Sequence, residues 1–195
     1  TFQVNAGYNT NSINRNSYIS KNNLLGNGYN GYVSVQNLSD WSKVLETILK
    51  YNQKFGKHGV DAMAGYSYQY FYDEGNHESA YGFLSDVFKW YSIQAATTIE
   101  TPSSYAECNK LISMYGRVNY NYDDRYLFTA TLRRDGSSRF GEDHKWGLFP
   151  SAAFSWRISQ EKFYHSKVVS DLKLRASYGV TGNQEIGNYN SLSTL

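Results

Sequence analysis

Apolar and polar residues alternate with a period of two along much of the second half of the chain. From Met114 to Tyr122 the even positions are apolar or small, and the odd positions carry mostly polar groups. Asp123 and Asp124 then predict a tight turn, after which the alternation begins again. A period of two indicates β-strands with one apolar and one polar face. The expected strands lie near 111–122, 125–134, 147–158 and 171–181.

The first half of the chain shows the same alternation with interruptions. Residues 59–72 place a series of tyrosines and aliphatic residues on one face. Residues 41–54 also fit a helical spacing in their first half, but a short turn at 55–58 joins them to this clear strand, which favours a strand. Residues 1–8 predict the end of another strand. We therefore expect an all-β chain of about seven strands.

The predicted connections differ in length in a regular way. Short turns lie at 55–58 and 123–124, with a moderate connection at 159–170. Long loops are expected near 9–40, 73–110, 135–146 and 182–195. In an up-and-down antiparallel sheet, all the long loops then fall at one end, as in outer-membrane barrels. Strands of about 9–11 tilted residues also cross the apolar core of a bilayer. The pattern predicts a segment of an antiparallel, up-and-down transmembrane β-barrel.

Composition excludes several other classes of protein. Among 195 residues, 19 Lys and Arg balance 17 Asp and Glu, so we expect no nucleic-acid partner. The single cysteine, Cys108, excludes an internal disulfide framework. The longest apolar run is about three residues, so neither a transmembrane helix nor a signal-peptide core is expected. The mean hydropathy of −0.60 is typical of soluble proteins, but alternating transmembrane strands have low averages too.

Aromatic residues gather near the two ends of the apolar face, with small and aliphatic residues between them. Amphipathic rings prefer the headgroup level of a membrane, where they form girdles. The expected lipid-facing girdle comprises Tyr66, Tyr68, Tyr70, Tyr120, Tyr122, Tyr126, Phe154, Trp156 and Tyr178. A charge facing lipid at the midplane costs about 2–4 kcal/mol, so the arginine-bearing face is expected to line a wet lumen. The expected lumen-facing residues are Arg117, Asn119, Arg133, Arg157 and Arg175.

Two predicted loops hold candidate contacts for a ligand or partner. The segment 135–140 suits a tight turn in which Asp135 or Ser137 binds backbone amides and Arg139 pairs with an acid, or a contact with substrate or a lipoprotein. Aromatic residues in the 73–110 loop suit either stacking on sugar rings or a small core of the loop itself. The candidate extracellular-loop contacts are Trp90, Tyr91, Tyr105, Asp135 and Arg139.

No enzyme motif has the context that its chemistry needs. Residues 26–31 match a GxGxxG pattern but are flanked by asparagines rather than by a strand and a helix. Residues 159–162 match SxxK without the partner motifs of an acylating enzyme. The four histidines are scattered without the spacing of metal ligands. We therefore expect no catalytic residue, no metal and no cofactor.

Specific sequence blocks carry a family resemblance. Their order and spacing resemble the SusC/RagA family of TonB-linked outer-membrane proteins. The blocks are YGRVNYNY at 115–122, DRYL at 124–127, RRDGSSRFG at 133–141, WGLFPS at 146–151, FSWRIS at 154–159, LKLRASYG at 172–179 and TGNQ at 181–184. Residues 41–72 look similar but are less specific, and 1–40 and 73–108 show no resemblance.

The resemblance implies a 22-stranded barrel in the outer membrane of a Gram-negative bacterium of the Bacteroidetes, in contact with outer-membrane lipid. It also implies an N-terminal plug, a SusD-like surface lipoprotein as a lid, and TonB as the energy source for import of oligosaccharides or peptides. The chain shows no signal peptide, TonB box, plug or closing strand. About seven strands do not close such a barrel, so we expect a fragment of its wall that does not transport by itself.

Two alternatives remain open at this point. A soluble or surface-exposed β-sandwich that serves in binding or adhesion also has strands with one apolar and one polar face. Its strands usually have about five to six residues, shorter than those expected here. A passive, porin-like barrel without coupling to TonB is the second alternative.

Overall fold

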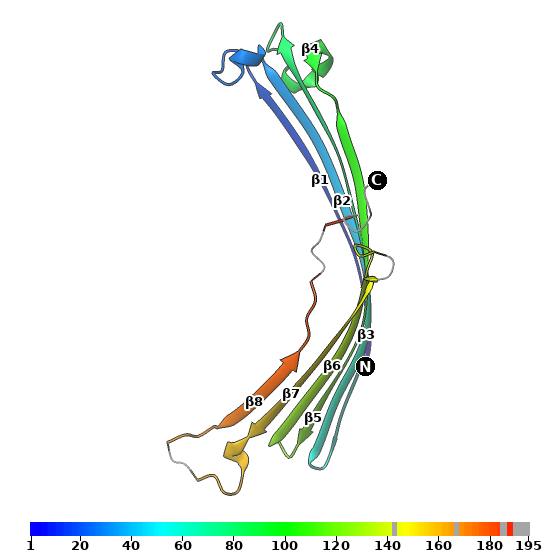
Figure 1. Cartoon of the computed structure of the whole chain (residues 1–195), viewed down its shortest axis with the longest axis vertical. Helices are drawn as coiled ribbons and strands as arrows, with labels where there is room; N and C mark the ends of the chain where they lie inside the picture. Colours follow the sequence, from blue (N-terminus) through cyan, green and yellow to red (C-terminus); the bar gives the residue numbers. More distant parts are fainter. Residues whose placement is uncertain (142–143, 166–167, 184–186, 189–195) are drawn as a thin grey trace. The chain divides into compact units, whose positions relative to one another are not determined.

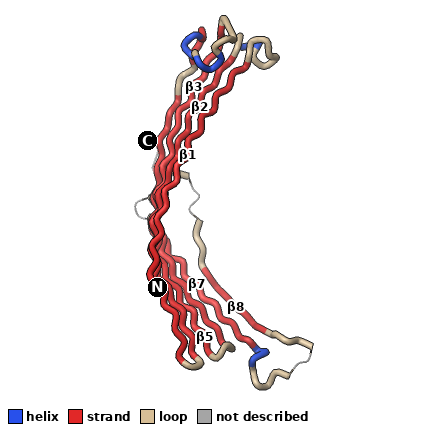
Figure 2. Tube along the Cα trace, turned by 180° about the vertical axis from the view of Figure 1, so that it is seen from behind, coloured by secondary structure: helices blue, strands red, loops and turns tan. Residues whose placement is uncertain are grey.

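The computed structural model describes residues 1–141, 144–165, 168–183 and 187–188 (Figure 1). Strands dominate it, and the helical parts are short 3₁₀ turns (Figure 2). The strands are β1 (Phe2–Ile19), β2 (Tyr32–Phe55), β3 (His58–Phe83), β4 (Ala96–Ile99), β5 (Ser103–Tyr122), β6 (Tyr126–Ser137), β7 (Trp146–Arg157) and β8 (Lys173–Gly179). The 3₁₀ turns are η1 (Asn27–Tyr29), η2 (Lys89–Tyr91), η3 (Ile93–Ala95) and η5 (Ile158–Gln160). In these residues, no helix has the length and apolar character needed to cross a membrane.

The eight strands of the described residues form one sheet. Its order is β1-β2-β3-β5-β6-β7-β8, with the short β4 paired to β3. Apart from β4, each strand is thus a neighbour of the next one along the chain, which confirms the predicted all-β, up-and-down antiparallel arrangement. The sheet is open in this part of the protein, with β1 and β8 at its two edges.

The chain divides into two compact units, which we describe separately. The first unit comprises 1–7, 43–70 and 109–195, and the second comprises 8–42 and 71–108. Strands β1, β2, β3 and β5 contribute residues to both units.

In the first unit, the register of β5, β6 and β7 continues without a bulge. It runs from Leu111↔Ser137 to Tyr122↔Tyr126 between β5 and β6, and from Tyr126↔Trp156 onward between β6 and β7. Because the side-chain period is two, an unbroken register keeps each residue set on its own face. Asp123 and Asp124, with φ of 52° and 55°, form the predicted tight turn between β5 and β6.

The strands are considerably longer than the sequence pattern predicts. The expected loops 9–40 and 73–110 lie largely in β1, β2, β3 and β5, which leaves 20–31 and 84–102 as the main connections. These strand portions are rich in Asn, Ser and Gly, residues that favour turns, and they lack a strongly apolar face. Backbone pairing with neighbouring strands holds them instead. The helical alternative for 41–54 is wrong, because these residues belong to β2.

The second unit has a small core of its own. Val33, Ala80 and Phe83 are buried there, and Tyr18 and Trp90 pack against them. Hydrogen bonds also link the connections 20–31 and 84–102 to each other and to the ends of the adjoining strands. The hydroxyl groups of Tyr18 and Ser20 donate to the two carboxylate oxygens of Asp86 at 2.5 and 2.8 Å. The amide of Phe83 donates to the carbonyl of Asn30 at 2.8 Å.

A glycine in β3 of the first unit lets a tyrosine of β5 lie across the strand. A Cβ atom on Gly65 would lie 2.4 Å from the ring of Tyr115. The Tyr115 hydroxyl thereby reaches β2, where it donates to Glu46 Oε1 at 2.8 Å. Glycine is therefore required at this crossing for steric reasons.

We predict that Gly65→Ala lowers the free energy of unfolding of the full-length protein by about 1–3 kcal/mol, because the new methyl group displaces the Tyr115 ring. Urea unfolding measures this change. Gly116→Ala is the matched control, since its Cβ would meet only the Met63 carbonyl oxygen at 3.7 Å, an ordinary contact. Equal stability of the two variants would contradict the role given to Gly65.

Candidate functional site

A network of polar side chains crosses four neighbouring strands on one face of the first unit. Asn119 of β5 stands at its centre. Its amide nitrogen donates to Asp61 Oδ1 at 2.9 Å, and its oxygen accepts the Thr129 hydroxyl at 2.9 Å. On the other side, Asn52 donates to Asp61 Oδ2 at 3.3 Å. The network thus links β2, β3, β5 and β6 through side chains.

A second network crosses the same face. Arg133 Nε lies 2.8 Å from both carboxylate oxygens of Asp135, and its guanidinium carbon stands 6.0 Å from the centre of the Tyr115 ring. Tyr115 contacts Glu46, which also accepts a hydrogen bond of 3.3 Å from Asn5. This network extends from β6 to β1. It combines an ion pair, a cation–π contact and two hydrogen bonds.

The register brings all the predicted lumen-facing residues to the face that carries these networks. Those residues are Arg117, Asn119, Arg133, Arg157 and Arg175. Arg117 donates to the Thr131 hydroxyl at 3.3 Å, and Arg157 lies 3.7 Å from Asp171. We call this surface the polar face. Its assignment to a lumen stays a prediction.

Sequence reasoning missed Glu46, Asp61 and Tyr115 in these networks. Alternation assigns a residue to a face, but it does not show which side chain reaches across a neighbouring strand. Gly65 is a usable signal, because a glycine in a strand interior often marks a close approach.

The opposite face of the first unit, which we call the apolar face, consists mainly of aliphatic, small and aromatic residues, and Arg134 lies on it against the Trp146 ring near the end of β6. Val118, Ala130, Ala152 and Tyr178 stand in one row across β5, β6, β7 and β8. A shallow groove of about 430 Å³ follows the small side chains of this face, among them Ala62, Ala64 and Gly116. Large aliphatic residues are exposed beside this row, including Leu132 at 52% and Leu148 at 56%. An exposed apolar surface of this extent marks an interaction site.

Aromatic rings form a row on the apolar face at the short-turn end of β5, β6 and β7. Tyr122 stacks on Tyr126 with ring centres 6.3 Å apart, and Tyr126 stacks on Trp156 at 6.4 Å. His58 joins the row through a 2.7 Å hydrogen bond with the hydroxyl of Tyr120. The register places Phe154 on the same face. The lipid contact expected of these residues stays a prediction.

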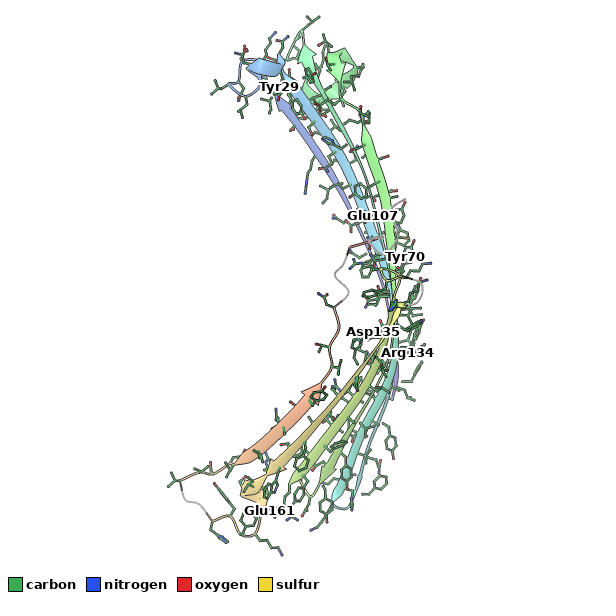
Figure 3. All side chains as sticks on the ribbon, viewed as in Figure 1. Tyr29, Tyr70, Glu107, Arg134, Asp135 and Glu161 are labelled. Carbon is green, nitrogen blue, oxygen red and sulfur yellow. The ribbon has the colours of Figure 1, made fainter. Side chains whose placement is uncertain are left out.

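The second unit contains an aromatic row that the predicted girdle omitted. Trp41 stacks on Tyr72, with ring centres 5.4 Å apart, and lies 6.3 Å from the Tyr8 ring. Tyr8 and Tyr72 occupy even positions in alternating segments, where the apolar face is expected, so the sequence pattern could have indicated this row. In the first unit, Lys110 stands 5.6 Å from the centre of the Tyr70 ring, a residue labelled in Figure 3.

In the first unit, a carboxylate at the short-turn end binds the polar atoms of two rings in the row formed by Tyr122, Tyr126 and Trp156. Glu161, labelled in Figure 3, accepts hydrogen bonds from the Tyr126 hydroxyl at 2.6 Å and from Trp156 Nε1 at 3.1 Å. Arg125 pairs with Glu161 at 3.1 Å and also with Asp123. Hydrogen bonds from Tyr126, Trp156 and Arg125 hold the pKa of the Glu161 carboxyl below its usual value. This cluster fixes the rings at the end of the sheet.

The candidate loop contacts differ in their surroundings. Trp90 packs against the core of the second unit, whereas Tyr91 is 80% exposed. Tyr105 and Asp135 were expected in loops, but both lie in strands. The Tyr105 hydroxyl donates to Asp73 at 3.1 Å, and Asp135 pairs with Arg133. Strand pairing extends past both positions, which is why the expected loop boundaries were wrong.

The segment after β6 contains part of the expected turn chemistry. The hydroxyl of Ser137 accepts a hydrogen bond from the backbone amide of Arg139 at 3.3 Å, as the turn prediction required. Arg139 Nε donates to Asn188 Oδ1 at 3.0 Å.

The two connections of the second unit expose a group of large apolar side chains. We call this group the tip patch. It comprises Leu24, Leu25, Leu84, Val87, Phe88 and Tyr91, with exposed fractions between 59% and 93%. The Lys21 ammonium donates to the Leu84 carbonyl at 3.0 Å, which links the two connections. Side chains of this size, exposed together, favour contact with another molecule.

Comparison with known proteins identifies the family. Residues 1–194 match the family model described as TonB dependent receptor-like, beta-barrel. The chain is 37% identical over 171 residues to TonB-dependent receptor P3 of Formosa agariphila, covering 87% of this chain and 17% of that protein. It is 37% identical over 165 residues to TonB-dependent receptor SusC of Bacteroides thetaiotaomicron, covering 84% and 16%.

Solved structures agree with this result. The structure of the RagAB peptide transporter matches with a TM-score of 0.87 and 28% identity over 97% of this chain and 21% of that one. The RagAB peptide importer in its open-open state matches with a TM-score of 0.86. The sheet is therefore a portion of a receptor barrel, and the chain belongs to the TonB-dependent receptor β-barrel family. It resembles SusC and RagA in particular, and it spans about one fifth or less of the length of these relatives.

We predict that Glu161→Gln weakens the acid dependence of stability. A carboxyl whose pKa is lowered on folding stabilises the folded protein above its unfolded pKa of about 4.5, and this stabilisation is lost as the pH falls through the lower folded-state pKa. The variant should be less stable than the wild type at pH 7, and the difference should shrink below pH 4.5. Thermal unfolding of the full-length protein from pH 3 to pH 7 measures both effects.

Lys162→Gln is the control for this prediction. It changes the charge by one at the next residue, which is exposed. Its stability profile should run parallel to that of the wild type in the acid range. A Glu161→Gln profile that also runs parallel to the wild type contradicts the assigned role of the carboxylate.

Proposed function

We propose that the full-length protein is an outer-membrane importer that takes up oligosaccharides or peptides, and that this chain forms part of its barrel wall. The observation that carries the proposal is the two-faced sheet in a chain of the TonB-dependent receptor family. One face holds charged and amide side chains, and the other exposes aliphatic side chains.

The energetic contrast between the faces supports a wall between lipid and water. A charge facing lipid at the midplane costs about 2–4 kcal/mol, whereas arginines facing a water-filled lumen avoid that cost. The aromatic rows suit the headgroup level, where one side of a ring is apolar and its tip is hydrated. On this proposal, the polar face lines the lumen and the apolar face contacts outer-membrane lipid.

Import needs a closed barrel, a plug and TonB in addition to the stretch of wall that this chain forms. A closed barrel, for which the family resemblance implies 22 strands, pairs β1 and β8 with further strands and leaves no free edge. On this proposal, TonB acts on a plug inside the lumen, and this chain supplies part of the wall around that plug. No residue of the chain takes a catalytic role in this mechanism.

The tip patch is the surface that we assign to a SusD-like surface lipoprotein. Its support is the exposure of Leu24, Leu84 and Tyr91 at 93%, 86% and 80%, together with the likeness to SusC and RagAB. Apolar side chains at this exposure favour burial against a partner.

A soluble β-sandwich has less support. Its apolar face is buried by a second sheet, but the described residues form a single sheet whose apolar face is exposed. The family match also disfavours a porin-like barrel without TonB coupling.

We predict that Ala152→Arg and Ala153→Arg have opposite outcomes. The two residues are neighbours in β7, but Ala152 lies on the apolar face opposite Ala130, and Ala153 lies on the polar face opposite Thr129. Ala152→Arg should cost about 2–4 kcal/mol, so that little full-length protein reaches the outer membrane, while Ala153→Arg is tolerated. Immunoblots of outer-membrane fractions measure both. Equal insertion of the two variants contradicts the assignment of the faces.

We also predict that uptake depends on TonB and on the lipoprotein. Cells with the full-length protein as their only route for the cargo should lose growth on it when tonB is deleted. They should also lose it when six tip-patch residues are replaced by serine, although the receptor still inserts. Growth that is unchanged without TonB points to a passive barrel instead.

A further inference from the structure

A small cavity lies on the polar face, between the ends of β6 and β7 and the described residues Phe140, His144 and Lys145. Its volume is about 210 Å³. Leu111, Arg133, Asp135, Phe140, His144 and Phe149 are among the residues that line it. Asp135 lies on the polar face and the preceding Arg134 on the opposite one, as the register requires (Figure 3).

Phe149 is an unusual residue for this face. The following odd positions of β7 are Ser151, Ala153, Ser155 and Arg157, all small or polar. The ring fits because two glycines leave room for it. A Cβ atom on Gly147 would lie 2.6 Å from the ring, and one on Gly182 would lie 2.4 Å from it. The function of a polar wall does not explain an aromatic ring held in this way.

The polar side of the cavity offers a hydrogen-bond donor and an acceptor side by side. Arg133 contacts Asp135 through Nε at 2.8 Å and donates to the Ser113 hydroxyl from Nη2 at 3.1 Å. These contacts do not engage Nη1, and the carboxylate has further lone pairs. The Arg133 side chain is 47% exposed and that of Asp135 is 24% exposed, so both remain accessible to a ligand.

These features select a class of ligand. Neighbouring hydroxyl groups match a donor and an acceptor placed side by side, and the C–H face of a sugar ring packs on an aromatic ring. Sites for drug-sized ligands measure about 300–1,000 Å³, so this smaller cavity suits a single ring. We propose that it binds one pyranose-sized ring of an imported oligosaccharide. This inference rests on the proposed function.

A peptide fits the cavity less well. Extended peptides are commonly bound by addition to a free strand edge. Here β6, which carries Arg133 and Asp135, is paired with β5 up to Leu111↔Ser137 and with β7 up to Gly136↔Trp146, so this strand offers no free edge. Arg133 and Asp135 pair with each other, which weakens the attraction of either side chain for a charged peptide end, and Lys145 is a further cation in the lining.

Binding to the purified full-length protein tests this assignment. Two mixtures serve as probes: oligosaccharides of the malto-, xylo-, manno- and galacto-series, and a tryptic digest of casein. Native mass spectrometry identifies the bound components, and calorimetry measures the affinity of the tightest one. An oligosaccharide should bind, with affinity weakened about 3- to 10-fold by Phe149→Ala and about 10-fold or more by Asp135→Asn.

Matched variants separate the cavity from general effects on the fold. Leu148→Ala changes the adjacent residue on the apolar face, and Asp171→Asn removes a carboxylate beside Arg157 instead of Arg133. Both should bind within twofold of the wild type. Phe149→Tyr keeps the ring and should bind within twofold as well.

Three results overturn the assignment: peptides bind instead of sugars, neither mixture binds, or sugars bind equally to Phe149→Ala, Asp135→Asn and the controls. None of these results bears on TonB-dependent uptake, which is measured separately in cells. Failure of the cavity assignment is therefore distinguishable from failure of the proposed function.

Discussion

The backbone hydrogen-bond ladder between β5, β6 and β7 is the constraint on which the rest of this structure depends. Its register continues without a bulge from the turn at Asp123 and Asp124 to the far ends of these strands. With a side-chain period of two, one slipped residue would exchange the two faces along a whole strand. Arg133 and Leu132 would then change places. The register therefore keeps Arg117, Arg133 and Arg157 away from the aliphatic residues, and it leaves Arg134, near the loop end of β6, on the apolar face. The suitability of the sheet as a membrane wall follows from this register.

Side-chain contacts across strands add a second level of order to the ladder. Tyr115 passes over Gly65 to reach Glu46, and Asn119 connects Thr129 with Asp61. Side chains at such positions are fixed in direction as well as in face. On the opposite face, the polar tips of Tyr126 and Trp156 meet the single carboxylate of Glu161. The strands therefore present ordered chemistry at the polar face and ordered rings at the turn end of the apolar face.

The sequence predicted the faces well and the strand lengths poorly, for physical reasons. Alternation from Met114 to Tyr122 and from Tyr126 to Arg134 reports directly on a regular strand. The outer parts of β1, β2, β3 and β5 are held by backbone pairing and carry Asn and Ser, whose local preference is for turns. The cavity beside Phe149 depends on how Gly147 and Gly182 meet one ring from distant positions. Periodicity contains no information about such a contact, so the sequence did not predict this cavity, although Arg133 and Asp135 of its lining were among the candidate site residues.

The central claim is that the apolar face contacts lipid while the polar face contacts water. A nitroxide scan of residues 148–156 in the full-length protein, with Cys108 replaced by serine, tests it directly in bilayers. The account predicts that even positions are accessible to oxygen, which concentrates in lipid, and that the odd positions 151 and 153 are accessible to a water-soluble nickel complex. The two accessibilities should therefore alternate with a period of two. Even positions that are accessible to neither reagent, as in a buried protein core, would contradict the account.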